Sequence, residues 1–220
     1  MLLQFENVTG NSGKFRLENI NFSLPAGYIM GLMGVNGAGK TTLIDYIMNE
    51  KKRYTGTIRL GGVDIRENHG YIKNYIGLVS DENPFIMERT GRQNAEILGV
   101  FYENFHMDIF SEALDMMELS GGLTYGKMSR GEKMKFQMAF AMAHKPVIYL
   151  LDEVTAGMDP VFRMDFFKIL NRIIRDENAS VLMTSHIESE MEQKTDYVGI
   201  LEQGKMIKFG ESFEVLQVCV

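Results

Sequence analysis

The sequence predicts an α/β fold, in which a core of buried parallel strands follows an N-terminal antiparallel β-layer and carries an inserted α-helical subdomain. Apolar and polar residues alternate through the opening third of the chain, as they do in half-buried strands. Two mainly apolar segments, at 147–151 and 180–183, each follow a helical segment rich in Met, Phe and Ile, which is typical of buried parallel strands. Apolar residues recur at helical spacing from about residue 87 to 117, which predicts the helical insert.

Length and composition indicate one globular domain. With 220 residues the chain is long enough to bury its own core, so we expect a single domain over 1–220 with the helical subdomain at about 86–130. Hydrophobic residues make up 45% and charged residues 24%, which excludes extensive disorder. The formal net charge of -6 disfavours nucleic acid as a partner. Because Cys219 is the only cysteine, no intrachain disulfide can form, and we expect a cytosolic protein.

The sequence predicts neither a signal peptide nor a membrane span. The N-terminal residues MLLQFE lack the basic start and the longer apolar run of a signal peptide. Elsewhere, the apolar runs break long before the roughly 18 residues that a membrane-spanning helix needs. If the protein acts at a membrane, we therefore expect another polypeptide to span it.

A strand, a glycine loop and a helix are predicted in succession near the N-terminus. The apolar strand at 29–33 runs into glycines, and Leu43, Ile44 and Ile47 follow at helical spacing. The loop between them, GVNGAGKTT at 34–42, fits the pattern G-x-x-x-x-G-K-[ST] in the structural context that this motif requires. This arrangement predicts a P-loop NTPase (RecA-like) core.

Each residue type of the loop suits the binding of phosphate. Glycines let successive backbone N–H groups surround phosphate oxygens, and the following helix presents its positive end. Lys40 can reach the outer phosphates, and the Thr41 hydroxyl can bind Mg²⁺. The residues expected to bind the nucleotide are Asn36, Gly37, Ala38, Gly39, Lys40, Thr41 and Thr42.

Two adjacent acids follow the apolar run at 147–151. The buried strand carries Asp152 to its carboxyl end, where the carboxylate can hold Mg²⁺ through water. Glu153 stands next to it, where it can polarise an attacking water. We therefore expect Glu153 to be catalytic and Asp152 to bind the metal and nucleotide.

Three more segments follow in order: MSRGE at 128–132, GMDP at 157–160 and TSH at 184–186. With the two earlier motifs, they make nearly the whole chain resemble the ATP-binding-cassette (ABC) family, whose signature is usually LSGGQ. The resemblance implies that Ser129 and Gly131 meet the γ-phosphate, that Asp159 lies in the D-loop at the nucleotide, and that His186 is a catalytic switch histidine.

A second segment, LSGGL at 119–123, is closer to the family's signature string. The family, however, places its signature serine at the start of a long helix that leads into the aspartate-bearing strand. Ser120 lies too far upstream and is followed by TYG rather than by a helical pattern. We therefore assign the signature to Ser129.

The chain departs from the family pattern at several positions. Asp81 takes the place of the Q-loop glutamine; it can accept hydrogen bonds from Mg²⁺-bound water, but it adds negative charge near the phosphates. The aromatic residue that stacks on adenine is missing from its usual place, so we expect Phe15 to substitute, and the preference for ATP over GTP stays open. Arg130 replaces a signature glycine, Glu132 a glutamine and Val154 a proline.

The resemblance also implies a mechanism and partners. Two cassettes of the family pair head to tail, so that the P-loop of one and the signature of the other enclose each ATP. Because one chain contains all of these elements, we expect a homodimer that hydrolyses ATP with Mg²⁺. The membrane permease is expected to be a separate subunit that holds this chain at the inner face of the membrane. By analogy within the family, the cargo is an exported drug or peptide.

Two alternatives stay open at this point. One is a soluble ABC ATPase acting on nucleic acid or ribosomes, although such members carry long coiled-coil insertions or paired cassettes with basic linkers. The other is a regulatory module that binds ATP and hydrolyses it poorly, which Asp81 and the missing adenine-stacking aromatic residue motivate. Retention of Glu153 and His186 argues against the second alternative.

Overall fold

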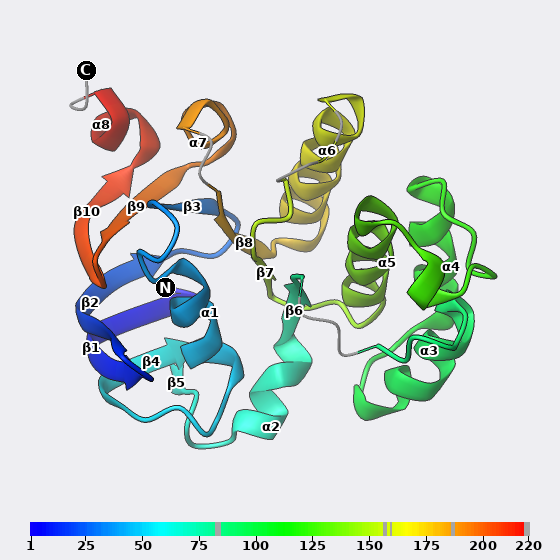
Figure 1. Ribbon diagram of the computed structural model, residues 1–220, viewed down its shortest axis with the longest axis horizontal. Coiled ribbons are helices and arrows are strands. Elements are labelled where there is room, and N and C mark those ends of the chain that lie inside the picture. The colour runs from blue at the N-terminus through cyan, green and yellow to red at the C-terminus, as the bar shows by residue number, and fades with distance from the viewer. Residues whose placement is uncertain (82–84, 156–157, 159, 186–187, 218–220) are drawn as a thin grey trace.

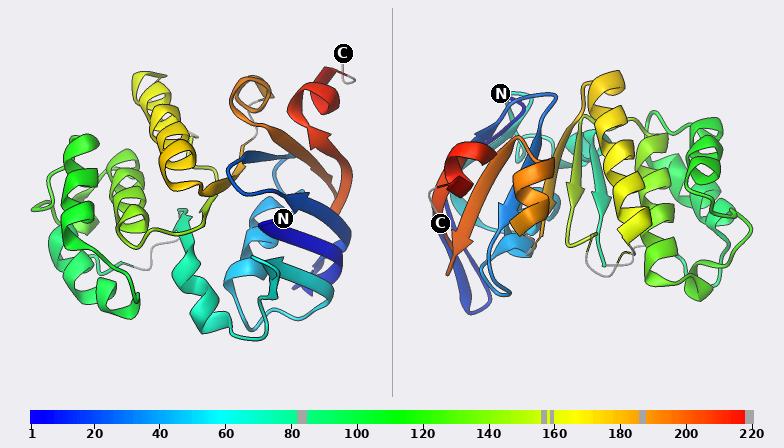
Figure 2. Two further views of the ribbon diagram at one scale, coloured as in Figure 1. Left: turned by 180° about the vertical axis from the view of Figure 1, so that it is seen from behind. Right: turned by 90° about the horizontal axis from the view of Figure 1, so that it is seen from above.

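Two β-sheets and a group of helices make up the computed structural model, which describes residues 1–81, 85–155, 158, 160–185 and 188–217 (Figure 1). Both views in Figure 2 place helices α3, α4 and α5 at one end of the molecule and the sheet of β1 and β2 at the other. The larger sheet lies between these ends. This arrangement is the predicted α/β class, with an antiparallel layer at the N-terminal end.

The first sheet is antiparallel and has the strand order β2-β1-β4-β5. Its strands are β1 (Leu3–Ser12), β2 (Phe15–Leu24), β4 (Tyr54–Leu60) and β5 (Val63–Asp64). The alternation in the sequence corresponds to a buried and an exposed face of β1: Leu3 and Phe5 are buried, whereas Glu6 is exposed. The predicted β-layer in the opening third is therefore confirmed.

The second sheet is mostly parallel and has the strand order β10-β9-β3-β8-β7-β6. Its strands are β3 (Ile29–Met33), β6 (Ile76–Val79), β7 (Ile148–Leu151), β8 (Ser180–Thr184), β9 (Tyr197–Glu202) and β10 (Lys205–Glu211). Only β10 runs antiparallel to its neighbour. All residues of β7 and β8 are buried, as their mainly apolar sequences predict.

Alternate residues of the parallel strands serve two separate cores. Ile148 and Leu150 pack with the antiparallel sheet and with α1 (Lys40–Met48), whereas Tyr149 and Leu151 face the other helices. Because successive side chains of a strand point to opposite faces, one short apolar run can fill both cores. The carboxyl ends of the central strands, where the candidate residues occur, are thus held between two packed layers.

The helical insert consists of α3 (Gly91–Leu98), the 3₁₀ turn η2 (Gly99–Phe101) and α4 (Met107–Met116). After the 3₁₀ turn η3 (Tyr125–Lys127), α5 (Arg130–Ala143) runs back to the parallel sheet and leads into β7. An aromatic cluster of Phe85, Tyr102, Phe105, Phe136 and Phe140 joins these segments. The helical periodicity predicted from 87 to 117 is confirmed, while the boundaries of a subdomain remain a prediction.

Five further helical segments complete the description. They are α2 (His69–Ile72), the 3₁₀ turn η1 (Lys73–Tyr75), α6 (Pro160–Glu177), α7 (Glu188–Lys194) and α8 (Ser212–Gln217). Helix α6 packs on the same face of the parallel sheet as α5 through Phe166, Leu170 and Ile173. Among the described residues, no helix combines the length and the hydropathy needed to cross a bilayer.

Candidate functional site

The glycine loop between β3 and α1 has the backbone conformation that phosphate binding needs. Gly34, Gly37 and Gly39 have φ values of 153°, 82° and 113°, which side chains disfavour. A Cβ on Gly34 would lie 2.4 Å from the carbonyl oxygen of Leu201. Helix α1 starts after Gly39 without a capping side chain and without an acid in its first turn. Its first N–H groups are therefore available to an anion.

Lys40 points into the loop rather than to solvent. The residue is only 4% exposed, and its Nζ donates hydrogen bonds to the carbonyl oxygens of Gly34 at 2.8 Å and Val35 at 3.3 Å. The same Nζ lies 3.6 Å from Oε1 of Glu153. The ammonium group is thus held between the loop and the acid, where a phosphate oxygen would be a stronger, charged acceptor than either carbonyl.

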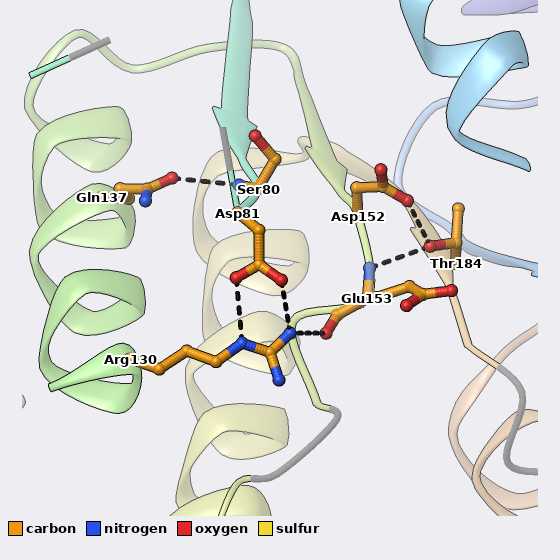
Figure 3. A network of polar contacts seen from close by, with 7 residues as sticks. All are labelled: Ser80, Asp81, Arg130, Gln137, Asp152, Glu153 and Thr184. Atoms are coloured by element: carbon orange, nitrogen blue, oxygen red, sulfur yellow. Dashed lines mark hydrogen bonds and ion pairs between the residues drawn. The ribbon is translucent and has the colours of Figure 1, made fainter. Parts of the chain in front are cut away.

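Asp152 and Glu153 follow β7 and are positioned by Thr184 at the end of β8 (Figure 3). The Thr184 hydroxyl donates to Oδ1 of Asp152 at 2.7 Å and accepts from the backbone N–H of Glu153 at 2.9 Å. Glu153 has a φ of 51°, in the left-handed region. This conformation is energetically unfavourable for a glutamate, and residues with such backbone angles are enriched at functional sites.

Sequence reasoning missed the role of Thr184. In the sequence, Thr184 is notable only as the first member of the 184–186 segment, but in the structure it ends a buried strand and is fully buried itself. Such a group needs a hydrogen-bond partner, and the adjacent β7 strand ends in the two acids. The contact between Thr184 and the two acids follows only once β7 and β8 are known to be parallel neighbours in the sheet.

A cavity of ≈ 560 Å³ brings the loop and the acids together. Its lining includes most of the predicted site residues: Phe15, Asn36, Gly37, Gly39, Lys40, Thr41, Thr42, Asp81, Asp152 and Glu153, together with Ser80. Ala38 is an exception, since it is buried at 2% exposure and packs beside Gly34. The backbone N–H of Ala38 donates to the carbonyl oxygen of Val35 at 3.0 Å, which tightens the turn.

The donor set of this cavity fits a nucleoside phosphate with Mg²⁺. Mg²⁺ in phosphate sites typically takes one or two carboxylates, phosphate oxygens and water. Asp152 and the Thr41 hydroxyl supply such oxygen ligands beside the loop. No group of three or more His, Cys, Asp or Glu side chains within the described part of the chain could hold a metal ion alone. The residues therefore fit a metal that is bound with its nucleotide.

Phe15 forms an apolar wall of the cavity. It begins β2, and its ring packs against the loop so closely that a Cβ on Gly39 would lie 2.9 Å from it. This placement agrees with the expected apolar contact to a base, and stacking on the base stays a prediction.

Asp81, which follows β6, lines the cavity but already has a charged partner (Figure 3). Arg130 donates from Nε to Oδ1 of Asp81 at 2.9 Å and from Nη2 to Oδ2 at 2.8 Å. In the sequence, the aspartate and the arginine are separate departures from the family pattern, and the structure joins them in one ion pair. A role of Asp81 in binding Mg²⁺ stays a prediction. In that role Asp81 would contact the water of the metal while it remains paired with Arg130.

Ser129 and Gly131 lie at the start of α5 and do not line the cavity. Ser129 is exposed, and its hydroxyl accepts the backbone N–H of Glu132 at 3.3 Å while the Glu132 carboxylate accepts the N–H of Ser129 at 2.8 Å. This capping box confirms that a helix starts after Ser129. Because the hydroxyl acts there as an acceptor, its hydrogen remains able to donate to a phosphate.

Two predicted residues, Asp159 and His186, lie outside the described residues, as does Gly157.

Comparisons with known proteins agree with this geometry. The profile of the family described as "ABC transporter" matches residues 17–156. The bacitracin transport ATP-binding protein BcrA of Bacillus licheniformis is 32% identical over 87% of this chain and 63% of its own length. The linearmycin resistance ATP-binding protein LnrL of Bacillus subtilis (strain 168) is 32% identical over 95% of this chain and 69% of its own length. The chain thus spans less than two thirds of the first of these relatives.

Solved structures show the same fold. A structure described as an ATP binding subunit of an ABC transporter has a TM-score of 0.88 at 22% identity and covers 100% of this chain and 93% of its own. The dimeric ATP-binding cassette MJ0796, bound to ADP and Pi, has a TM-score of 0.84 at 21% identity and covers 96% of this chain and 99% of its own.

Proposed function

The chain belongs to the ABC transporter family, and from that premise we propose that it binds and hydrolyses ATP with Mg²⁺ to drive transport through a separate membrane subunit. One observation carries this proposal: the glycine loop, Lys40, Asp152 and Glu153 converge on a single cavity. The cavity offers N–H donors and an ammonium group for phosphates on one side and a potential base on the other.

The residues of the cavity divide the chemistry between them. The N–H groups of the loop and the start of α1 bind the phosphate oxygens, and Lys40 exchanges its carbonyl partners for the outer phosphates. Asp152 and Thr41 hold Mg²⁺, which neutralises charge on the phosphates when it is bound. Glu153 orients and polarises the attacking water, and Thr184 keeps both acids in place.

A second cassette completes the site. Ser129 and Gly131 lie on α5 outside the cavity of their own chain, and Ser129 is exposed. A head-to-tail dimer brings these groups to the nucleotide of the partner. The solved neighbour MJ0796, which is described as dimeric with ADP and Pi bound, supports this arrangement. Because both halves of the site are on one chain, a symmetric homodimer has two equivalent sites.

An apolar groove beside the cavity suits a cytosolic helix of the membrane subunit. A second cavity of ≈ 400 Å³ lies between the β6 end of the sheet and the helical insert, with Leu78, Tyr102 and Phe140 in its lining. Phe101 at its edge is 77% exposed, and a large apolar side chain on the surface favours an interface. Ser80 lines both cavities, so a helix in the groove is in contact with the segment that reaches the phosphates.

The names of the relatives support a type of cargo. One is named for bacitracin transport, another for linearmycin resistance and a third as a probable multidrug transporter. We propose export of a drug or antimicrobial peptide, with this chain held at the inner face of the cell membrane by its permease.

The decisive experiment measures the mass of Glu153→Gln by size-exclusion chromatography with light scattering, with and without ATP and Mg²⁺. This variant should retain unhydrolysed ATP, and we expect an ATP-dependent shift from monomer to dimer. Glu118→Gln is the matched control, because Glu118 is exposed, has a φ of 52° like Glu153, and lies away from the cavity. A Glu153→Gln variant that binds ATP and stays monomeric would contradict the homodimer. Wild-type protein without ATPase activity would contradict the hydrolytic function itself.

A further inference from the structure

The ion pair between Asp81 and Arg130 joins two parts of the chain at the edge of the phosphate cavity. Both oxygens of Asp81 accept from the guanidinium, which is the two-pronged geometry that arginine favours. Nη2 of Arg130 also lies 3.4 Å from the carbonyl oxygen of Glu153. One side chain at the start of α5 thus contacts Asp81 and the backbone of the expected catalytic residue (Figure 3).

A second contact fixes the same segment to the same helix. The buried Gln137 accepts the backbone N–H of Ser80 at 3.0 Å and donates to the hydroxyl of Tyr125 at 3.2 Å. Gln137 and Arg130 lie about two helical turns apart, on one face of α5. The residue before Asp81 and the side chain of Asp81 are therefore both held by this face.

The pair contributes little to the stability of the fold. The side chains of Arg130 and Asp81 are 45% and 63% exposed, and exposed ion pairs contribute little because water screens them. The position of the pair is more informative. Asp81 lines the phosphate cavity together with Asp152 and Glu153, so three carboxylates face the place where a polyanion binds.

We propose that Arg130 is a positioning residue that neutralises Asp81 and holds it at the edge of the cavity, so that nucleotide binding depends on the pair rather than on either residue. This inference rests on the proposed function. Without the guanidinium, the carboxylate of Asp81 repels the phosphates, which carry charge of the same sign. The two departures from the family pattern are in this view a single change, in which an acid is tolerated because an arginine accompanies it.

The proposal predicts effects of opposite sign for the two partners. Arg130→Gln leaves the acid unpaired, and we expect the dissociation constant for ATP to rise about tenfold, because the unpaired carboxylate and the phosphates repel each other. Asp81→Asn removes the acid, and we expect equal or tighter binding. The double variant Asp81→Asn/Arg130→Gln should bind almost as wild type does, because neither charge remains. Added salt should reduce the defect of Arg130→Gln, since it screens the repulsion.

The experiment is a double-mutant cycle in which ATP binding to the full chain is measured by calorimetry, without and with Mg²⁺. Arg92→Gln is the matched control: Arg92 pairs with Glu96 at 3.2 Å on the exposed face of α3, and its loss should leave ATP binding unchanged. Thermal unfolding of every variant reports whether it folds. Arg130→Lys keeps the positive charge but cannot make the two-pronged contact with Asp81, so it should weaken ATP binding to an intermediate degree. This variant replaces Arg130→Gln in the cycle if Arg130→Gln does not fold.

The outcomes separate this inference from its premise. Rescue of Arg130→Gln by Asp81→Asn supports the pair, because removing Asp81 could not restore a contact that Arg130 makes to a nucleotide on a partner chain. If wild type binds ATP and the double variant binds as weakly as the summed effects of the two single substitutions predict, the inference is overturned and the proposed function stands. If wild type does not bind ATP, both are overturned.

Discussion

The two sides of the phosphate cavity hold their residues in different ways. On the side of β3 and β7, backbone conformation sets most of the geometry: Gly34 and Gly39 have positive φ values of 153° and 113°, and Glu153 has a φ of 51°. On the side of α5, side chains set it, since Arg130 holds the carboxylate of Asp81 and Gln137 holds the N–H of the preceding residue. The first arrangement accepts few residue types, whereas the second can be built from many pairs.

This difference predicts how each side responds to substitution. Changes beside the loop and the acids should remove the chemical step or the conformation that supports it. Changes beside α5 should adjust affinity, stability or coupling to a partner and leave the chemistry in place. The four predictions below test this contrast, from the largest expected effect to the smallest.

Glu153→Gln should give the largest loss. Replacing the carboxylate by an amide of the same shape removes the base, and we expect kcat for ATP hydrolysis to fall by about 10²–10⁴-fold, the usual contribution of general base catalysis. The dissociation constant for ATP should change little, because Lys40 and the loop N–H groups remain. Steady-state ATPase assays and equilibrium binding measure the two quantities separately. A parallel loss of ATP binding would show that Glu153 has a structural role instead.

Thr184→Val tests the support beneath the acids. Valine has nearly the shape of threonine but neither accepts the N–H of Glu153 nor donates to Asp152. An unsatisfied buried donor costs about 1–3 kcal/mol, so we expect that loss in the free energy of unfolding, with a lower kcat as well. Thr184→Ser keeps the hydroxyl and is the control. Equal stability of the valine variant and wild type in urea unfolding would contradict this role.

The sequence was informative where the backbone sets the geometry. The glycine loop and the acids after 147–151 could be recognised because their spacing follows from a strand that ends at a tight turn. The buried strands themselves were predicted from continuous apolar runs, and the start of α5 from the position of Ser129 relative to β7. In each case a local pattern carries the physical requirement.

Sequence reasoning was less informative where distant side chains meet. Asp81 and Arg130 lie far apart in the sequence, and nothing local indicates that one neutralises the other. The same holds for Thr184, whose partners follow another strand, and for Gln137, whose partner follows β6. These contacts depend on the order of the strands in the sheet and on the path of α5, which hydrophobic periodicity does not specify.

His144 gives the helical side a pH dependence of its own. The ring stacks on Tyr102 with centroids 4.2 Å apart, and Nδ1 donates to the carbonyl oxygen of Asn74 at 3.2 Å. Burial, which disfavours the charged ring, lowers the pKa of His144 from 6.5 to about 4. The unfolded chain therefore binds a proton more readily than the folded chain between these values. The stability that depends on the neutral His144 ring is therefore fully present above the unfolded pKa of 6.5, and it is lost as the pH falls from 6.5 towards 4.

At pH 5, His144 should lower the free energy of unfolding by about 2 kcal/mol relative to neutral pH. Each pH unit between the folded and the unfolded pKa corresponds to about 1.4 kcal/mol. His144→Asn keeps a donor for Asn74 but does not titrate, so its stability should fall less between pH 7 and pH 5. Urea unfolding at the two pH values measures the difference. His69, whose pKa is also lowered by burial, is present in both proteins, so its contribution cancels. Identical pH slopes for the two proteins would contradict the assignment.

Phe101→Ser should have the smallest effect on the isolated chain. The side chain is 77% exposed, and substitutions of exposed residues usually change the free energy of unfolding by less than about 0.5 kcal/mol. ATP binding should also be unchanged, because Phe101 lines the groove and not the phosphate cavity. Association with the membrane subunit, reconstituted in vesicles, should nevertheless weaken, since the groove loses its most exposed aromatic ring. Phe213→Ser is the matched control, because Phe213 is 70% exposed on α8, away from the groove. If both serine variants associate as wild type does, the groove is not the docking site.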